Sequence, residues 1–326
     1  MKKVLIAILL LGLLPHASAD YIHWVDFRLS APVLRSALEL DMASQGGEQP
    51  LDWIDILALA AAWRGGTGVT VADTQRAAQA LRGDTPPERL PGMAGRYFSY
   101  YREAYGAALG GLAGHFAIRR TDPQTGEAEW IPAYGLKAFS PIAAGYPWSH
   151  YPDFGAQRSY GYARPHLGND ILGALGTPIC AVEGGTVEAL GWNRYGGWRI
   201  GIRSDDRKRY YYYAHLRKDA PYAPGLAVGQ RVQAGEVIGF MGRTGYSTQE
   251  NVNNIETVHL HFGLQLIFDE SQKECDSEIW IDVYPIVELL ASHCSSVARD
   301  PQTGRWERLY PYCDLDAEPL RSAAAR

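Results

Sequence analysis

From about residue 155 to residue 270 the chain shows the pattern of short strands joined by tight turns. Runs rich in Val, Ile and Tyr alternate there with glycine-rich segments, which is typical of a compact β domain. These runs are Thr186–Leu190, Trp198–Arg203, Tyr210–Ala214 and Val237–Met241. The charged run from Ser204 to Arg209 predicts a solvated hairpin turn between two of them.

Residues 20–118 have helical composition instead. A helix predicted over Leu51–Trp63 stops at the glycine pair Gly65-Gly66, a common helix end. Further helices are predicted from Ser30 to Leu38, over Thr70–Leu81 and over Tyr97–Phe116. We therefore expect an α+β protein in which an N-terminal helical domain precedes a small, mainly antiparallel β domain.

The first residues predict an export signal. Lys2 and Lys3 precede an apolar run from Val4 to Leu14, and the small residues Ala17-Ser18-Ala19 follow. The run is too short to cross a bilayer, which takes ~20 residues, although an uncleaved membrane anchor is the alternative. We expect a signal peptide over residues 1–19 and no integral membrane span after its removal. The protein would then be exported from a bacterial cell, to the periplasm, cell wall or exterior.

The remaining domain boundaries are placed where Pro and Gly residues interrupt the helical and strand patterns. We expect a helical domain over 20–118, a linker over 119–150, the β domain over 151–270 and a C-terminal extension over 271–326. The motif DPQTG occurs at 122–126 and again at 300–304, and it predicts a turn at each place. Ile281–Ala291 is expected to be helical, and the rest of the extension irregular.

Charge and cysteine content exclude several classes of protein. The net charge is −5, which gives no basic surface for nucleic acid. No CxxC pair is present, so a zinc site built from thiolates is not expected. Cys180 is predicted to be a small buried hydrophobe. Cys275, Cys294 and Cys313 allow at most one disulfide among themselves.

The sequence His259-Leu260-His261-Phe262 carries the clearest chemical pattern. On a strand, side chains alternate between faces, so the two histidines share one face while Leu260 and Phe262 point to a core. Two imidazoles on one face are suited to metal binding and proton transfer.

Two further segments add to this pair. His166 and Asp170, in PHLGND, share a face in a helix and also in an extended chain, so either conformation aims both at one metal. His215 ends the aromatic run YYYYAHL and could lie opposite. Each histidine alone is commonly structural, but HxxxD, AHL and HLHF together predict a metal centre.

These blocks resemble a known family. HLGNDILGALGTPICAVEGGTV, YYYYAHL, VGQRVQAGEVIGFMGRTGYST and VHLHFGLQ stand in the order found in the lysostaphin-type (LytM-like) zinc endopeptidases, which cut peptidoglycan peptides as DD- or glycyl-endopeptidases. The resemblance covers roughly residues 155–268. It implies a LytM-like β-sandwich with a groove over one Zn²⁺ ion, and every position that the family requires is present.

The resemblance implies a role for each histidine. His166, Asp170 and His261 would hold the zinc, and His215 and His259 would be the catalytic histidines. Zinc with three protein ligands keeps an open position and lowers the pKa of a bound water to ~7. No HExxH motif is present, so the base is expected to be His259 or His215, and the sequence does not assign which. The resemblance implies a secreted peptidoglycan hydrolase that cuts the cross-links or bridges of the cell wall.

Several points stay open at this level. Tyr213 and Thr244 are weaker candidates for contact with the peptide in the groove. The helical domain is a candidate cover over the groove or a docking element. A non-catalytic wall-binding or amidase-activating module is the main alternative, and it predicts missing ligands. A lipoyl- or biotin-carrier barrel needs a hairpin-tip lysine, which neither glycine-rich block has.

Overall fold

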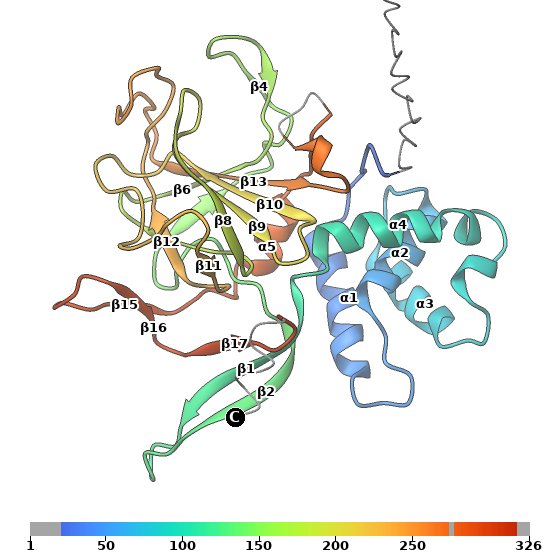
Figure 1. Ribbon diagram of the computed structural model, residues 1–326. Helices are drawn as coiled ribbons and strands as arrows, with labels where there is room; N and C mark the ends of the chain where they lie inside the picture. The colour runs from blue at the N-terminus through green and yellow to red at the C-terminus, as the bar shows by residue number, and fades with distance from the viewer. Residues whose placement is uncertain (1–20, 274–276, 318–326) are drawn as a thin grey trace, which may run out of the picture.

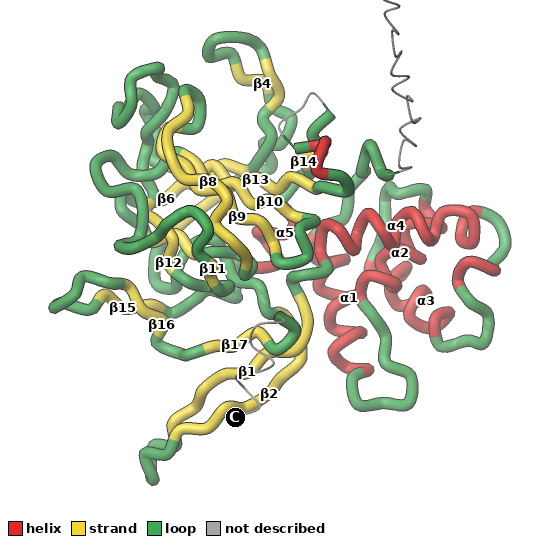
Figure 2. Tube along the Cα trace, viewed as in Figure 1, coloured by secondary structure: helices red, strands yellow, loops and turns green. Residues whose placement is uncertain are grey.

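The computed structural model of the chain describes residues 21–273 and 277–317. The predicted signal peptide, residues 1–19, and Cys275 lie outside these described residues. Four helices gather at one side of the molecule and the strands at the other, as Figure 1 and Figure 2 show. The expected α+β class, with helices followed by an antiparallel β domain, is confirmed.

Two helices of the N-terminal region begin at residues whose side chains cap them. Its elements are α1 (Ala31–Ser44), α2 (Trp53–Arg64), α3 (Val71–Leu81), the 3₁₀ helix η1 (Pro87–Arg89) and α4 (Met93–Leu109). The Asp52 carboxylate accepts the N–H of Ile54 in the first turn of α2, and α2 ends at Gly65 with a positive φ of 63°. Thr70 and Asp73 form a reciprocal capping box at the start of α3.

Helix α4 is shorter than expected. It stops at Leu109 and not at Phe116, because the chain turns at the glycine pair 110–111 and continues as a strand. A side chain at Gly111 would collide with the carboxylate of Glu183, so glycine is required where the helix end meets the β domain.

The segment 119–150 is not an irregular linker. Strands β1 (Ala113–Thr121) and β2 (Ala128–Leu136) form a long hairpin, and β17 (Tyr312–Asp314) pairs with the outer edge of β1. The described part of the C-terminal extension therefore returns to this hairpin. Both DPQTG copies are turns, each closed by an Asp main-chain N–H bond, from Asp122 to Glu127 and from Asp300 to Arg305.

The large sheet has the order β11-β8-β9-β10-β13-β6-β3, and β14 pairs with β13. All its pairings are antiparallel. Its strands are β3 (Trp148–His150), β6 (Asn169–Gly173), β8 (Gly185–Asn193), β9 (Gly197–Ser204), β10 (Arg209–Ala214), β11 (Arg231–Val232), β13 (His259–Leu266) and β14 (Ile279–Trp280). The runs predicted as strands match β8, β9, β10 and the separate strand β12 (Val237–Phe240).

Smaller elements surround this sheet. Strand β12 pairs with β7 (Pro178–Cys180), β4 (Gln157–Arg158) with β5 (Arg164–Pro165), and β15 (Val297–Arg299) with β16 (Trp306–Arg308). Of the two remaining elements, η2 (Glu270–Gln272) precedes β14 and α5 (Tyr284–Leu290) follows it. Helix α5 lies within the helix predicted for 281–291.

One buried apolar cluster joins the helices to the sheet. It includes Leu57 and Tyr105 from the helices, Ile202 and Phe262 from the sheet, and Leu290 from α5. Helical region and β domain therefore share a core, and burial of this shared apolar surface holds them together.

The predicted solvated turn from Ser204 to Arg209 does connect β9 to β10, but its last residue is buried. Arg209 is 1% exposed, and its Nε donates to the Glu183 carboxylate at 2.7 Å. Its Nη1 donates to the main-chain oxygen of Ala107 at the end of α4, at 2.8 Å. A buried guanidinium is stable only with such partners, so this turn is also the polar link between the two parts of the chain.

Two further expectations, on the cysteines and on membrane-spanning helices, can be compared with the described residues. Cys180 is fully buried in β7, as expected, and Cys294 and Cys313 are free thiols. Across residues 21–273 and 277–317 no helix has the length and apolar character needed to cross a membrane.

Candidate metal centre and active site

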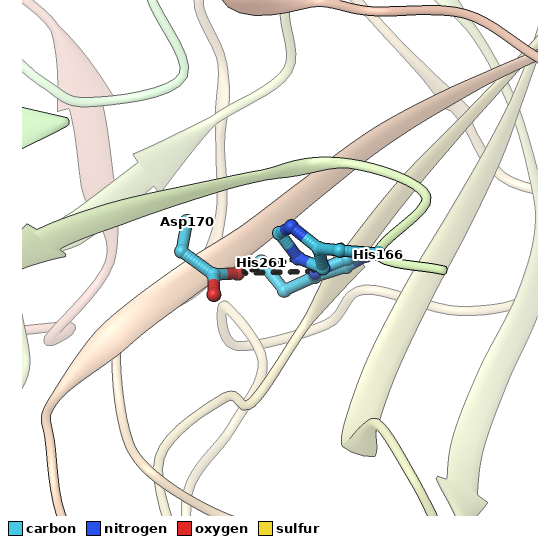
Figure 3. A group of neighbouring side chains, drawn as sticks. All are labelled: His166, Asp170 and His261. Carbon is cyan, nitrogen blue, oxygen red and sulfur yellow. Dashed lines mark hydrogen bonds and ion pairs between the residues drawn. The ribbon is translucent and has the colours of Figure 1, made fainter. Parts of the chain in front are cut away.

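Strand register brings the predicted ligands together. Asp170 on β6 and His261 on β13 are directly opposite each other in the antiparallel ladder, and His166 follows the short strand β5. The Nε2 atom of His166 lies 2.8 Å from Nδ1 of His261 and 3.0 Å from Oδ1 of Asp170, and the latter two atoms are 3.2 Å apart. Figure 3 shows the three side chains converging on one point.

The spacing of these atoms suits a tetrahedral ion. Ligand atoms ~2.1 Å from such an ion lie ~3.4 Å from one another, close to the separations above. Two imidazole nitrogens and one carboxylate oxygen form a donor set typical of zinc with an open position. Gly168 permits this approach, because a Cβ there would lie 2.7 Å from Cε1 of His261.

Asp153 and Arg158 hold the ligands in place. Nδ1 of His166 faces the main-chain oxygen and Oδ2 of Asp153, each at 3.1 Å, so Nε2 is left with its lone pair toward the site. Arg158 Nη2 donates to Asp153 Oδ2 at 3.0 Å and to Asp170 Oδ2 at 2.9 Å. Asp170 therefore keeps Oδ1 for the metal while Oδ2 is bound by the guanidinium.

The charges around His166 attract a cation. Burial alone would lower the pKa of His166, but hydrogen bonds and charge from Asp153 and Asp170 outweigh burial and raise the pKa to about 9. Burial likewise opposes ionisation of Asp170, yet His166 and His261 hold the pKa of Asp170 well below its usual range. A proton and a metal ion compete for the same lone pair, so both shifts mark a site where positive charge is favoured.

The two predicted catalytic histidines lie beside this centre. The ring centroids of His215 and His259 are 4.8 Å apart, and Nε2 of His259 lies 3.7 Å from Asp170 Oδ1. Each Nδ1 faces a main-chain oxygen at 2.9 Å, that of Thr244 for His215 and that of Thr257 for His259. A carbonyl can only accept, so both rings carry their proton on Nδ1 and keep Nε2 as a base.

His215 is held in a strained backbone conformation. Its φ is 60°, a region that residues other than glycine rarely adopt and that occurs at functional sites. Its main-chain N–H donates to Gly196 at 2.7 Å. Burial, followed by the nearby His259 and His261, lowers the pKa of His215 well below its usual value, so the ring is neutral and able to accept a proton at neutral pH.

Neither predicted groove residue faces the cavity. Tyr213 is fully buried, and its hydroxyl oxygen accepts the N–H of Val182, because alternate residues of β10 point into the core. The neighbouring Tyr212 lines the cavity instead. Thr244 is also fully buried and acts through its main-chain oxygen, which holds His215.

A cavity of about 310 Å³ opens over the metal centre. Its lining residues all lie between Arg158 and Trp280, and His166, Asp170, His215 and His261 are among them. None comes from the helical residues that the structure describes, so the cover predicted for that domain stays a prediction. The cavity follows the open face of β9, β10 and β13.

Sequence reasoning missed Asp153 and Arg158, and it gave Tyr246 no role although Tyr246 lies in the quoted block that ends in GRTGYST. Tyr246 stacks on Tyr160 with ring centroids 4.6 Å apart and lies 5.9 Å from the His215 ring. No motif marks Asp153 or Arg158. Asp153 and Arg158 precede His166 in a segment with little regular structure, and only the folded chain shows their contacts.

Comparison with known proteins agrees with this geometry. Residues 164–274 match the model of peptidase family M23, and this segment contains all five histidine and aspartate residues of the centre. The β domain of the chain is therefore similar to peptidase family M23 over these residues.

Named relatives are similar to part of the chain. The chain is 40% identical over 130 residues to the L-Ala–D-Glu endopeptidase of Bacillus subtilis, across 40% of this chain and 38% of that protein. It is 39% identical over 98 residues to glycyl-glycine endopeptidase ALE-1 of Staphylococcus capitis, across 30% and 24% of the two chains. The chain thus matches well under half of the length of these relatives.

The chain also aligns with part of a solved structure. The catalytic domain of lysostaphin from Staphylococcus simulans aligns with 44% of this chain and 92% of its own, at 29% identity and a TM-score of 0.33.

Proposed function

We propose that the chain is a zinc metalloendopeptidase that hydrolyses peptide bonds in the peptidoglycan of bacteria. The observation that carries the proposal is the convergence of His166, Asp170 and His261 beside two further imidazoles, each of which has its Nδ1 on a main-chain oxygen. The relatives named as endopeptidases of L-Ala–D-Glu and glycyl-glycine bonds support the substrate class.

His166, Asp170 and His261 would hold the ion. When bound, zinc supplies polarisation of a carbonyl and a water molecule of lowered pKa. The protein's own contribution is to place these three ligands on one side, leaving the cavity side open to a peptide.

His215 and His259 would move the proton. Because Nδ1 of each ring is bound to a carbonyl, Nε2 of either ring can take a proton from the attacking water and return it to the leaving amine. The second ring can donate to the developing oxyanion once it is protonated. The neutral state of His215 at neutral pH suits the first of these roles.

Export from the cell belongs to the same proposal. A peptidoglycan hydrolase meets its substrate outside the cytoplasmic membrane, and the basic, apolar and small-residue segments of residues 1–19 have the order of a signal peptide.

Cleavage of purified peptidoglycan tests the proposal. Wall preparations with glycine bridges and with direct cross-links are incubated with the zinc-loaded protein, and the fragments are identified by mass spectrometry. We expect new peptide amino termini from at least one wall type and none with His215→Ala. Absence of cleavage in every preparation, with zinc bound, would favour the non-catalytic module.

A further inference from the structure

The cavity over the metal centre is lined by more cationic than anionic side chains, although the chain as a whole has a net charge of −5. Four of its lining residues are cations, against the two carboxylates of Asp170 and Glu278. These cations are Arg158, Arg164, Arg199 and Lys273.

Two of the four cations already have carboxylate partners. Arg158 is bound to Asp153 and Asp170, and Nζ of Lys273 lies 2.6 Å from the Glu188 carboxylate. For Arg164 and Arg199, in contrast, no carboxylate of residues 21–273 or 277–317 lies within ion-pair distance.

Arg199 lies on β9, in the sheet face that lines the cavity. Its Nε is buried and has no hydrogen-bond partner among the described residues. Leaving a buried charged donor unpaired is costly, and such a group in a folded protein calls for a partner. The cavity beside it is where an external acceptor would enter.

Arg164 is held rigidly at the rim. Its guanidinium carbon lies 4.5 Å from the ring centroid of Tyr195, and its Nη1 donates to the main-chain oxygen of Tyr160 at 2.7 Å. The same carbon lies 5.7 Å from the ring centroids of Tyr162 and of Tyr246. Stacking fixes the plane of the guanidinium without neutralising it, so its other N–H groups remain for a ligand.

We propose that Arg199 and Arg164 bind carboxylates of the substrate peptide, so that the site selects acidic stem peptides over uncharged glycine bridges. This inference rests on the proposed endopeptidase function and names its substrate class. Guanidinium–carboxylate bonds are charge-assisted and directional. A glycine bridge offers neither arginine a charge and would leave the Arg199 donor unpaired, which is how a polar site rejects a ligand.

Binding is the direct test. Calorimetry on the zinc-loaded full chain compares a peptidoglycan stem peptide, the same peptide with every carboxylate converted to a carboxamide, and pentaglycine amide. We expect the acidic peptide to bind about tenfold or more tightly than either neutral peptide. The preference should shrink as salt is added, because salt screens a charge-based preference.

Variants assign the preference to the two arginines. Arg199→Gln and Arg164→Gln should each weaken binding of the acidic peptide by about tenfold and leave that of the amidated peptide within about twofold. Arg199→Lys should keep part of the preference. Arg194→Gln is the matched control, because Arg194 also stacks on Tyr195 but does not line the cavity. Melting curves confirm that each variant is folded.

The outcomes separate the two proposals. Equal binding and equal cleavage of the acidic and amidated peptides would overturn the carboxylate preference and leave the endopeptidase function intact. A preference that Arg199→Gln abolishes, without cleavage of any peptide or wall, would support the carboxylate site and overturn the hydrolase. Equal weakening of both peptides by Arg199→Gln would also contradict the inference.

Discussion

The Nδ1 atom of His215 lies 2.9 Å from the main-chain oxygen of Thr244. Because that oxygen can only accept, this contact fixes the tautomer of the ring and directs its unprotonated Nε2 toward the cavity. Nδ1 of His259 likewise faces the main-chain oxygen of Thr257, and its Nε2 lies 3.7 Å from Asp170 Oδ1. In this arrangement the residues that would bind the ion differ from the two histidines that would transfer protons.

Replacement of His215 by alanine tests that separation. We expect His215→Ala to keep its zinc and to lose turnover by about 10²–10⁴-fold, the usual contribution of a general acid or base. Metal analysis and peptide cleavage measure the two quantities, and His23→Ala, at an exposed histidine outside the cavity, is the control. Loss of the metal in His215→Ala would show that this ring is a ligand.

Asp153 is expected to set the affinity of the site without being a ligand. In Asp153→Asn the side chain can no longer supply charge to His166 and Arg158, so zinc should bind about 10–100-fold more weakly. Competition with a coloured chelator measures this change. Asp219→Asn, at an exposed aspartate that pairs only with Asn251 among the described residues, should bind zinc as the unaltered protein does. Unchanged zinc affinity in Asp153→Asn would show that Asp153 does not set the affinity of the site.

Zinc binding should release a proton at neutral pH. The raised pKa of His166, about 9, means that its imidazole is protonated at pH 7 in the metal-free protein, and the ion must displace that proton. The pKa values of His261 and Asp170 are lowered, so these ligands contribute none. Apparent affinity should therefore rise from pH 7 to about 9 and then level off.

Calorimetry in two buffers of different protonation enthalpy counts the released protons. A count near one at pH 7, falling above pH 9, is the expected result. No proton release at pH 7 would show that His166 is already neutral.

The buried link between Arg209 and Glu183 should be important for stability. Arg209→Ala leaves the Glu183 charge buried without its partner and removes the bond to the end of α4, so unfolding should become easier by about 3–5 kcal/mol. Arg209→Met combined with Glu183→Gln removes the charge as well and should cost less. Urea unfolding measures both, and a loss below about 1 kcal/mol in Arg209→Ala would contradict the proposed role of the pair.

The same link bears on the role of the helical domain. A chain that starts at residue 140 lacks both α4 and the shared core residues of the helices. We expect this shortened chain to be less stable, and a change in its activity has to be corrected for the fraction that is folded.

Local sequence patterns predicted the structural features that depend on neighbouring residues, such as helices and strand alternation. The glycine stop at Gly65 and the helical composition predicted α2 and α3 closely, since both signals are local. Asp52 and Thr70, which the prediction placed inside these helices, are their N-caps. The alternation in His259–Phe262 predicted a strand with two histidines on one face, because strand periodicity depends only on the order of residues. The end of α4 was placed too late, because the prediction ran past the glycine pair 110–111, where the chain turns against Glu183.

Contacts between residues far apart in the chain could not be predicted from the sequence. The return of β17 to β1 joins residues almost 200 positions apart, and its three residues carry no pattern that names a partner. Tyr213 was assigned to the groove although the phase of β10 places Tyr212 there. The burial of Arg209 could not be read from a charged run, because its compensating groups come from other parts of the chain.

Metal analysis of the purified protein, combined with cleavage before and after removal of the ion by a chelator, tests the central claim most directly. The account predicts about one zinc per chain, loss of cleavage on chelation, recovery when zinc is returned, and no bound zinc in His261→Ala. Full peptide cleavage by protein shown to be free of metal would contradict it.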